Sequence, residues 1–276
     1  MPEPAEKDDM TDGRGAIRAG ALPARPRLRA ELMDFLRFAL RPRPGRRLPG
    51  RAAGHGVWVD FLPNVRFTRL LQWAALLWLA NLFVFGPLAV SAAEMGGAQH
   101  RLSLLNLPWM QALIWAPIVE ELTFRHALRR PAMLWWFVPL MASVIVQGAG
   151  FASGLLAAAA LLLCLAPLWS PSGAPLRGAW RLSWARRRQV LRWYPWLYHL
   201  SSIAFGAVHL YNFHLHEMPA TLMPLLVLPQ WFTGLVLGWM RVRRGIGASM
   251  LLHALFNAGP LLVVLLILHF APGAAA

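Results

Sequence analysis

Long, uninterrupted blocks of apolar residues limit how this chain can fold more than any other feature. Apolar residues fill 57% of the 276 positions and run together, instead of recurring every three or four residues as in a soluble helix. A helix needs about 20 apolar residues to cross a hydrocarbon core. We therefore predict an all-α, polytopic transmembrane helix bundle of about seven spans, at residues 68–92, 107–127, 132–149, 150–169, 195–213, 219–240 and 246–270.

The composition changes near residue 67 and divides the chain in two. Residues 1–67 are predicted to be a cytoplasmic N-terminal tail, and residues 68–276 the transmembrane domain. The tail starts with the polar stretch "MPEPAEKDDMTDGRG", which lacks the apolar region of a cleavable signal peptide and is predicted to be disordered. Residues 28–40 predict an amphipathic helix on the inner membrane surface, although an unpacked linker is the alternative. Its apolar face comprises Leu28, Leu32, Phe35, Leu36 and Ala39.

The net charge of +15 is concentrated between the predicted spans. Arginines crowd the residues before Leu70 and the segments 125–130, 177–192 and 241–244, whereas the other connections hold few. With seven spans these basic segments all fall on one side, as the positive-inside rule requires. This pattern predicts an inside N-terminus and an outside C-terminus. Membrane lipids are then the expected partners of the arginines, and nucleic acid is not.

Small residues indicate how the spans pack. Gly150 with Gly154 and Gly234 with Gly238 form GxxxG pairs, a spacing that lets helices approach closely. Cys164 is the only cysteine, so the chain can form no internal disulfide, and we expect this thiol to be a packing residue.

Charged residues within one predicted span need an explanation, because each costs roughly 2.5–3.5 kcal/mol at mid-membrane. The stretch "IVEELTFRHAL" (118–128) contains Glu120, Glu121 and Arg125. Glu121 and Arg125 are four residues apart and can form an ion pair along one helix face. Glu120 is rotated from Glu121 by about 100° and is left without that partner. Packing explains the pair well and the additional carboxylate poorly.

Two further motifs bring polar groups into the spans. "FGAVH" places Phe205 and His209 on one face, and "HALFN" places His253 and Asn257 on one face. A free carboxylate and an imidazole can activate water, and paired donors can hold a developing oxyanion. Together with Glu120, these groups on three helices indicate a hydrolase.

The three motifs, in order, resemble the EExxxR, FxxxH and HxxxN motifs of the CPBP family. This family comprises the CAAX-prenyl-protease and bacteriocin-processing membrane proteases and is also called the Abi or Rce1-type family. The resemblance covers about residues 105–262, which would be the motif-bearing core of a protease domain, and excludes the N-terminal 67 residues. It implies an all-α bundle that hydrolyses peptide bonds.

The resemblance also implies a role for each motif residue. Glu120 and His209 would activate water, and His253 and Asn257 would stabilise the oxyanion. The supporting residues would be Glu121, Arg125 and Phe205. Our span boundaries place Glu120 toward the inner side and His209 in the outer half, so an offset or tilt of the helices must bring them level.

Three rival interpretations stay open. A zinc enzyme could use Glu120, His209 and His253 as ligands, although no HExxH motif is present. A rhomboid-like serine protease could use Ser249, which lies four residues before His253, but this leaves Glu120 unexplained. A non-catalytic transporter or bacteriocin-immunity protein could use the same polar residues.

We therefore predict an intramembrane glutamic endopeptidase without a cofactor, zinc dependence being the alternative. The expected substrate is a peptide or protein, such as one with a prenylated or membrane-anchored tail. Ala- and Arg-rich usage favours a bacterial inner membrane.

Overall fold

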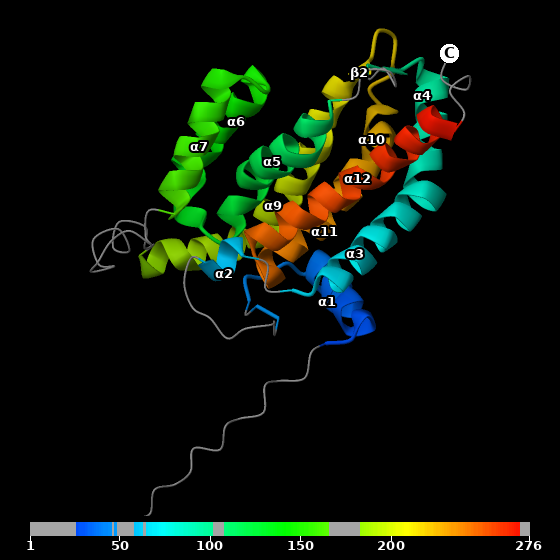
Figure 1. Cartoon of the computed structure of the whole chain (residues 1–276). Coiled ribbons are helices and arrows are strands. Elements are labelled where there is room, and N and C mark those ends of the chain that lie inside the picture. The colour runs from blue at the N-terminus through cyan, green and yellow to red at the C-terminus, as the bar shows by residue number, and fades with distance from the viewer. Residues whose placement is uncertain are drawn as a thin grey trace, which may run out of the picture.

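The chain folds into a bundle of long helices in a computed structural model, which describes residues 26–45, 47–48, 58–62, 65–101, 108–165 and 183–270. Figure 1 shows the central helices α3 (Phe67–Ala80), α5 (Ala116–Arg125), α9 (Trp184–Val208), α11 (Leu228–Arg244) and α12 (Ile246–Phe270) side by side. The short helices α1 (Leu28–Leu40) and α2 (Trp58–Phe61) lie across one end of this bundle, which we call the basic end. The predicted disordered start and residues 177–182 of the predicted basic segment 177–192 lie outside the described residues, and the rest of that segment belongs to the start of α9.

Helices occupy all seven predicted ranges, and two of them meet the length and hydropathy expected of a membrane span. These two are Phe67–Gly96, with mean hydropathy 1.8, and Ile246–Phe270, with mean hydropathy 2.3. The apolar helices Pro131–Gln147 and Phe151–Leu165 are shorter. The mostly helical fold is therefore as expected, whereas the count of seven spans stays a prediction.

Several helix ends differ from the predicted ones. α9 begins eleven residues before the predicted position 195 and ends at Val208, short of 213. The predicted span 219–240 is divided into α10 (Met223–Leu226) and α11, which continues to Arg244. Hydropathy locates the apolar part of a helix, and the arginine-rich ends of α9 and α11 are helical without being apolar.

Two π turns interrupt the helices, and each lies one residue before a proline. The first π turn, Asn81–Phe85, joins α3 to α4 (Gly86–Gly96), and the second, Gln111–Trp115, leads into α5. In each case the following N–H bonds the carbonyl five residues earlier, Gly86 to Asn81 and Ala116 to Gln111. Because Pro87 and Pro117 have no N–H, these wider turns let the helix continue past a proline.

The helix predicted at residues 28–40 is present as α1 and packs against the bundle, so it is not the unpacked linker that we named as the alternative. Its position on the inner membrane surface stays a prediction. Phe35 and Phe38 are 3% and 2% exposed, and both belong to the main hydrophobic core. The Phe35 ring packs edge-on against Trp73 of α3 and Trp239 of α11. The acidic residue Glu31 of α1 is buried as well, at 1% exposed, and contacts Trp73 and Arg244. Acids that find arginine partners inside the protein need not face water.

Glycines allow α9 and α11 to approach closely, as predicted for one of the two GxxxG pairs. A Cβ added to Gly238 would lie 2.8 Å from the Tyr198 ring, and one added to Gly234 would lie 3.1 Å from Phe205. The other pair has no such function. Gly150 precedes α7 (Phe151–Leu165), and a Cβ on Gly154 would meet nothing within 4 Å.

The helices α6 (Leu134–Gln147) and α7 form a hairpin beside α5, with a second hydrophobic core between them (Figure 1). Cys164 lies in this core with no exposed surface, which agrees with its predicted packing role. At the opposite end from α1, a two-stranded antiparallel sheet pairs β1 (Gln99–His100) with β2 (Phe213–His214). This small sheet is the one departure from an all-α fold within the described residues.

Candidate active site

Glu121 is the centre of a buried polar cluster that joins α5 to α12. The Arg125 Nη1 atom lies 3.0 Å from Glu121 Oε1, and both side chains have no exposed surface, so the i,i+4 pair expected from the sequence is present. Ser249 Oγ donates a hydrogen bond to Glu121 Oε2 and also lies 2.9 Å from the carbonyl of Leu237. His253 Nδ1 lies 3.2 Å from Glu121 Oε1. Glu121 therefore has partners on both of its oxygens.

Glu120, its neighbour, has a different environment. Its side chain is 18% exposed, and its Oε2 atom is buried without a hydrogen-bond partner among the described residues. The closest charged or ionisable contact of Oε2 is His253 Nε2, at 3.8 Å. A buried carboxylate oxygen without a donor is costly in a folded protein, so packing alone does not explain why Glu120 lies here.

The ring of Phe205 packs against three of the polar motif residues. The guanidinium carbon of Arg125 lies 3.8 Å from the ring centroid, a cation–π contact. The rings of His209 and His253 pack edge-on against Phe205, with centroids 4.8 and 5.7 Å away. The Glu120 carboxylate interacts electrostatically with His209. The three motifs thus meet. The predicted bounds of the fifth span, 195–213, were displaced toward the C-terminus, because α9 runs from Trp184 to Val208.

The partners of the two histidines determine which ring nitrogen carries hydrogen. His209 Nδ1 lies 2.7 Å from the carbonyl of Phe205, and His253 Nδ1 faces the Glu121 carboxylate. Both partners only accept hydrogen bonds, so each Nδ1 carries the hydrogen. In the neutral ring Nε2 then has a lone pair, which suits His209 to accept a proton. His253 donates from Nε2 only when its ring is protonated, and Glu120 and Glu121 lie close enough to neutralise that charge.

Asn257 is oriented by the π turn before α5. In a regular helix the carbonyl of Ala112 would accept from Ala116, but the Ala116 N–H bonds Gln111 and Pro117 has no N–H. The Ala112 carbonyl instead accepts from Asn257 Nδ2 at 2.8 Å. One amide hydrogen of Asn257 is used in this way, and this bond fixes the direction of the second.

The arrangement suits acid–base hydrolysis. An unpartnered carboxylate oxygen and a neutral imidazole lie near each other, and two more donor groups come from α12. Among the described residues, no group of three or more His, Cys, Asp or Glu side chains is placed to hold a metal ion. The rhomboid-like pairing of Ser249 with His253 is not formed, since both side chains contact Glu121 instead.

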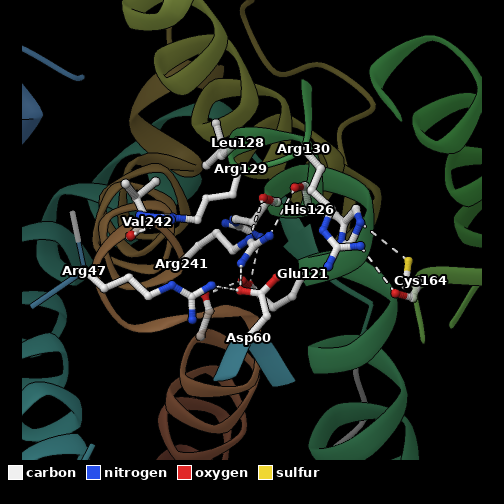
Figure 2. Close-up of polar contacts among 12 residues, drawn as sticks. Arg47, Asp60, Glu121, His126, Leu128, Arg129, Arg130, Cys164, Arg241 and Val242 are labelled. Atoms are coloured by element: carbon white, nitrogen blue, oxygen red, sulfur yellow. Dashed lines mark hydrogen bonds and ion pairs between the residues drawn. The ribbon is translucent and has the colours of Figure 1, made fainter. Parts of the chain in front are cut away.

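Sequence reasoning did not find a second buried cluster at the basic end. Asp60 of α2 forms ion pairs with Arg47 and with Arg241 of α11 (Figure 2). Burial opposes ionisation of Asp60, but Arg241 and Arg47 outweigh it and hold its pKa well below the usual value. Burial lowers the pKa of Arg129 nearby to about 10. The only sequence signal was an excess of arginines in the turn 241–244, which we had attributed to membrane topology.

Comparison with known proteins supports the relationship suggested by the motifs. The family model described as "Type II CAAX prenyl endopeptidase Rce1-like" matches residues 102–259, which is more than half of the chain and includes all three motifs. No curated protein and no solved structure matches the chain. With the apolar helices, the match identifies an integral membrane protein of a protease family that acts on peptide or protein substrates. The chain belongs to the Rce1-like family of type II CAAX prenyl endopeptidases.

Proposed function

We propose that this protein is an intramembrane glutamic endopeptidase that hydrolyses a peptide bond near the membrane surface. The observation that carries this proposal is the difference between two adjacent glutamates. Glu121 is paired on both oxygens, whereas Glu120 Oε2 is buried without a hydrogen-bond donor beside His253 and His209. Such an oxygen can bind a water molecule and remove its proton.

The proposed reaction assigns one task to each group. Glu120, helped by the lone pair on His209 Nε2, takes a proton from water, and the resulting hydroxide attacks the carbonyl carbon of the scissile bond. The oxyanion accepts hydrogen bonds from protonated His253 and from the second amide hydrogen of Asn257. The proton held by Glu120 and His209 then passes to the leaving amine, so that the peptide bond breaks and the enzyme is restored.

The supporting residues hold these groups in position. Glu121 fixes the Nδ1 edge of His253, and Arg125 neutralises Glu121. Phe205 supplies an apolar surface against which Arg125, His209 and His253 all rest. A rigid apolar support of this kind keeps reacting groups within the small tolerances that catalysis needs.

The membrane orientation is part of the same proposal. The arginines at positions 47, 69, 129, 130 and 241–244 lie at the basic end, where Arg129 Nε bonds the carbonyl of Val242 at 2.9 Å. The first half of α9 reaches this end as well, since Tyr194 donates to the carbonyl of Leu128. We place the basic end at the inner face of a bacterial inner membrane, with the N-terminus inside and the C-terminus outside.

The experiment uses the purified protein in liposomes with an internally quenched, farnesylated peptide that ends in a CAAX sequence. An unprenylated version of the peptide tests whether the lipid is needed. Glu120→Gln should insert and purify normally without cleaving either peptide, whereas Glu94→Gln, on the exposed side of α4, should behave as wild type. Proteomic comparison of membranes with wild-type or Glu120→Gln protein identifies natural substrates. Equal membrane proteomes and no peptide cleavage by wild type would favour the non-catalytic transporter or immunity protein.

A further inference from the structure

Residues 28–62, which we call the N-terminal segment, contact the C-terminal end of α11 at the basic end of the bundle. The last turns of α11 contain Arg241, Arg243 and Arg244, and each forms an ion pair with a different acid from residues 28–62. The partners, in the same order, are Asp60, Asp34 and Glu31. Residues 28–62 precede the range matched by the family model, 102–259.

Arg241 connects this segment to the C-terminal end of α5. Its guanidinium is fully buried and forms a fork with three acceptors: Nη1 bonds Asp60, Nε bonds the carbonyl of Arg125 at 3.1 Å, and Nη2 bonds the carbonyl of His126 at 3.3 Å (Figure 2). The last carbonyls of a helix have no partner within the helix. Arg241 supplies that partner at the helix end that follows Glu120 and Glu121.

Asp60 is what allows Arg241 to stay buried at this position. Arg47, Arg129 and Arg130 surround the pair, and the Asp60 carboxylate interacts electrostatically with all three of them as well as with Arg241. A buried guanidinium without a counter-charge is strongly unfavourable. Loss of Asp60 would therefore displace Arg241 from the carbonyls of α5.

The same segment also contacts the start of α12. A Cβ added to Gly247 would lie 1.7 Å from the carbonyl oxygen of Phe61, so the backbone of α2 rests directly on the first turn of α12. Gly247 precedes Ser249 by two residues and His253 by six. Phe61 thus touches α12 directly, and Asp60 reaches the end of α5 through Arg241.

We propose that Asp60 and Arg241 are positioning residues, which fix the C-terminal end of α5 and so hold Glu120 and Glu121 in register with His253 of α12. This inference rests on the proposed function, since it assigns a task to a catalytic centre formed by those residues. It makes the N-terminal segment part of the enzyme rather than a separate tail.

The experiment compares Arg241→Lys with a matched control, Asp34→Asn. Lysine keeps the charge for Asp60 but lacks the planar fork that reaches both carbonyls of α5. Asp34→Asn breaks an ion pair of the same interface, with Arg243, and has no contact with α5. For each variant we would measure kcat and KM with the farnesylated peptide, the melting temperature, and hydrogen exchange of the backbone amides at 125–130.

Arg241→Lys should lower kcat on the order of 10- to 100-fold, as small misplacements of reacting groups do, with little change in KM. Exchange at 125–130 should become faster. Asp34→Asn should lower the melting temperature and leave kcat and that exchange unchanged. The double variant Asp60→Asn with Arg241→Met removes the buried guanidinium that Asp60→Asn alone would strand, so it should recover part of the stability lost in Asp60→Asn while kcat stays low. Recovery of kcat along with stability would reduce the pair to a structural role and overturn the inference.

Hydrogen exchange separates this inference from the proposed function. If the wild-type protein does not cleave the peptide, the endopeptidase proposal fails on that result alone. Faster exchange at 125–130 in Arg241→Lys would still support the coupling between the N-terminal segment and α5. Unchanged exchange and unchanged kcat in Arg241→Lys would overturn it.

Discussion

Glu121 holds the Nδ1 edge of His253 at 3.2 Å, while the Nε2 edge of the same ring lies 3.8 Å from Glu120. Two adjacent residues of one helix therefore meet opposite edges of one imidazole on another helix. The Glu121 carboxylate is also bound by Arg125 and Ser249 and is therefore fixed in place. Glu120 Oε2, by contrast, has no hydrogen-bond donor among the described residues.

The two glutamates should fail in different ways when each is changed to glutamine. Glu120→Gln keeps the shape and removes the base, so the protein should stay stable and lose at least the 10²–10⁴-fold expected of a general base. Glu121→Gln leaves Arg125 buried without its counter-charge, which costs roughly 3–5 kcal/mol, so its melting temperature should fall. Melting in detergent and single-turnover cleavage measure the two effects.

A double variant provides the control for this comparison. Glu121→Gln with Arg125→Met removes both charges and should recover part of the stability, whereas no partner change should rescue Glu120→Gln. If Glu120→Gln were fully active, or Glu121→Gln stable but inactive, the assigned roles would be wrong and Glu121 would become the candidate base.

Ser249→Ala tests whether the serine is a nucleophile or a hydrogen-bond donor. The variant loses the contacts with Glu121 and the Leu237 carbonyl, and one such bond contributes about 1 kcal/mol. We expect a slightly lower melting temperature and activity within about tenfold of wild type. Complete inactivation of a stable Ser249→Ala protein would revive the serine-protease interpretation.

Chelation tests the zinc alternative. If the water is activated by Glu120 and His209 alone, exhaustive treatment with a chelator should leave peptide cleavage unchanged. Metal analysis of the active protein should then find well below one zinc per chain. Loss of cleavage that added zinc restores would instead make Glu120, His209 and His253 metal ligands.

Asp60 should make stability depend on acid. Its pKa is lowered in the folded protein, so its ion pairs stabilise the fold fully above the unfolded value of about 4, and this contribution disappears as the pH falls toward the folded value. Asp60→Asn should lower the melting temperature at pH 7, and the gap to wild type should narrow below about pH 4. A gap independent of pH would mean that Asp60 contributes through packing rather than charge.

Reporter fusions test the proposed topology. A reporter joined after Arg244, at the basic end, should be inside, and one joined after Ala276 should be outside, because α12 runs between them. A fusion after Gly97, at the end of the first long apolar helix, should also be outside and serves as a control. If the reporters fused after Arg244 and after Ala276 were found on the same side of the membrane, α12 would not cross it.

The sequence was most informative where the interacting residues are close in the chain. The span 246–270 was predicted with its observed ends, because one apolar run follows Gly245. The pair Glu121–Arg125 could be read from helical spacing alone. The family was also predicted correctly, because three short motifs in order carry more information than each one separately.

Contacts between distant segments could not be predicted in the same way. Asp60 and Arg241 are 181 residues apart, and Asn257 and Ala112 are 145 apart. An arginine that pairs with a buried acid looks, in sequence, the same as one that faces lipid headgroups. Nothing local in residues 28–40 indicates that the acids Glu31 and Asp34 will meet two tryptophans and three arginines from α3 and α11.

The π turn at Gln111–Trp115 determines which glutamate of the pair faces His209. A π turn is equivalent to one residue inserted into an α-helix, and one residue corresponds to about 100° of rotation. Asn257 anchors this helix at Ala112, within the turn, so the helical phase of everything after it depends on the inserted residue. Without the insertion, the side chains after the turn would be rotated by about the angle that separates Glu120 from Glu121. The division of labour between two chemically identical neighbours thus depends on the length of the helix before them. A single-residue deletion at 113–115 that kept the Asn257 contact would move Glu121 toward the place of Glu120, and Glu120 toward the place of Val119.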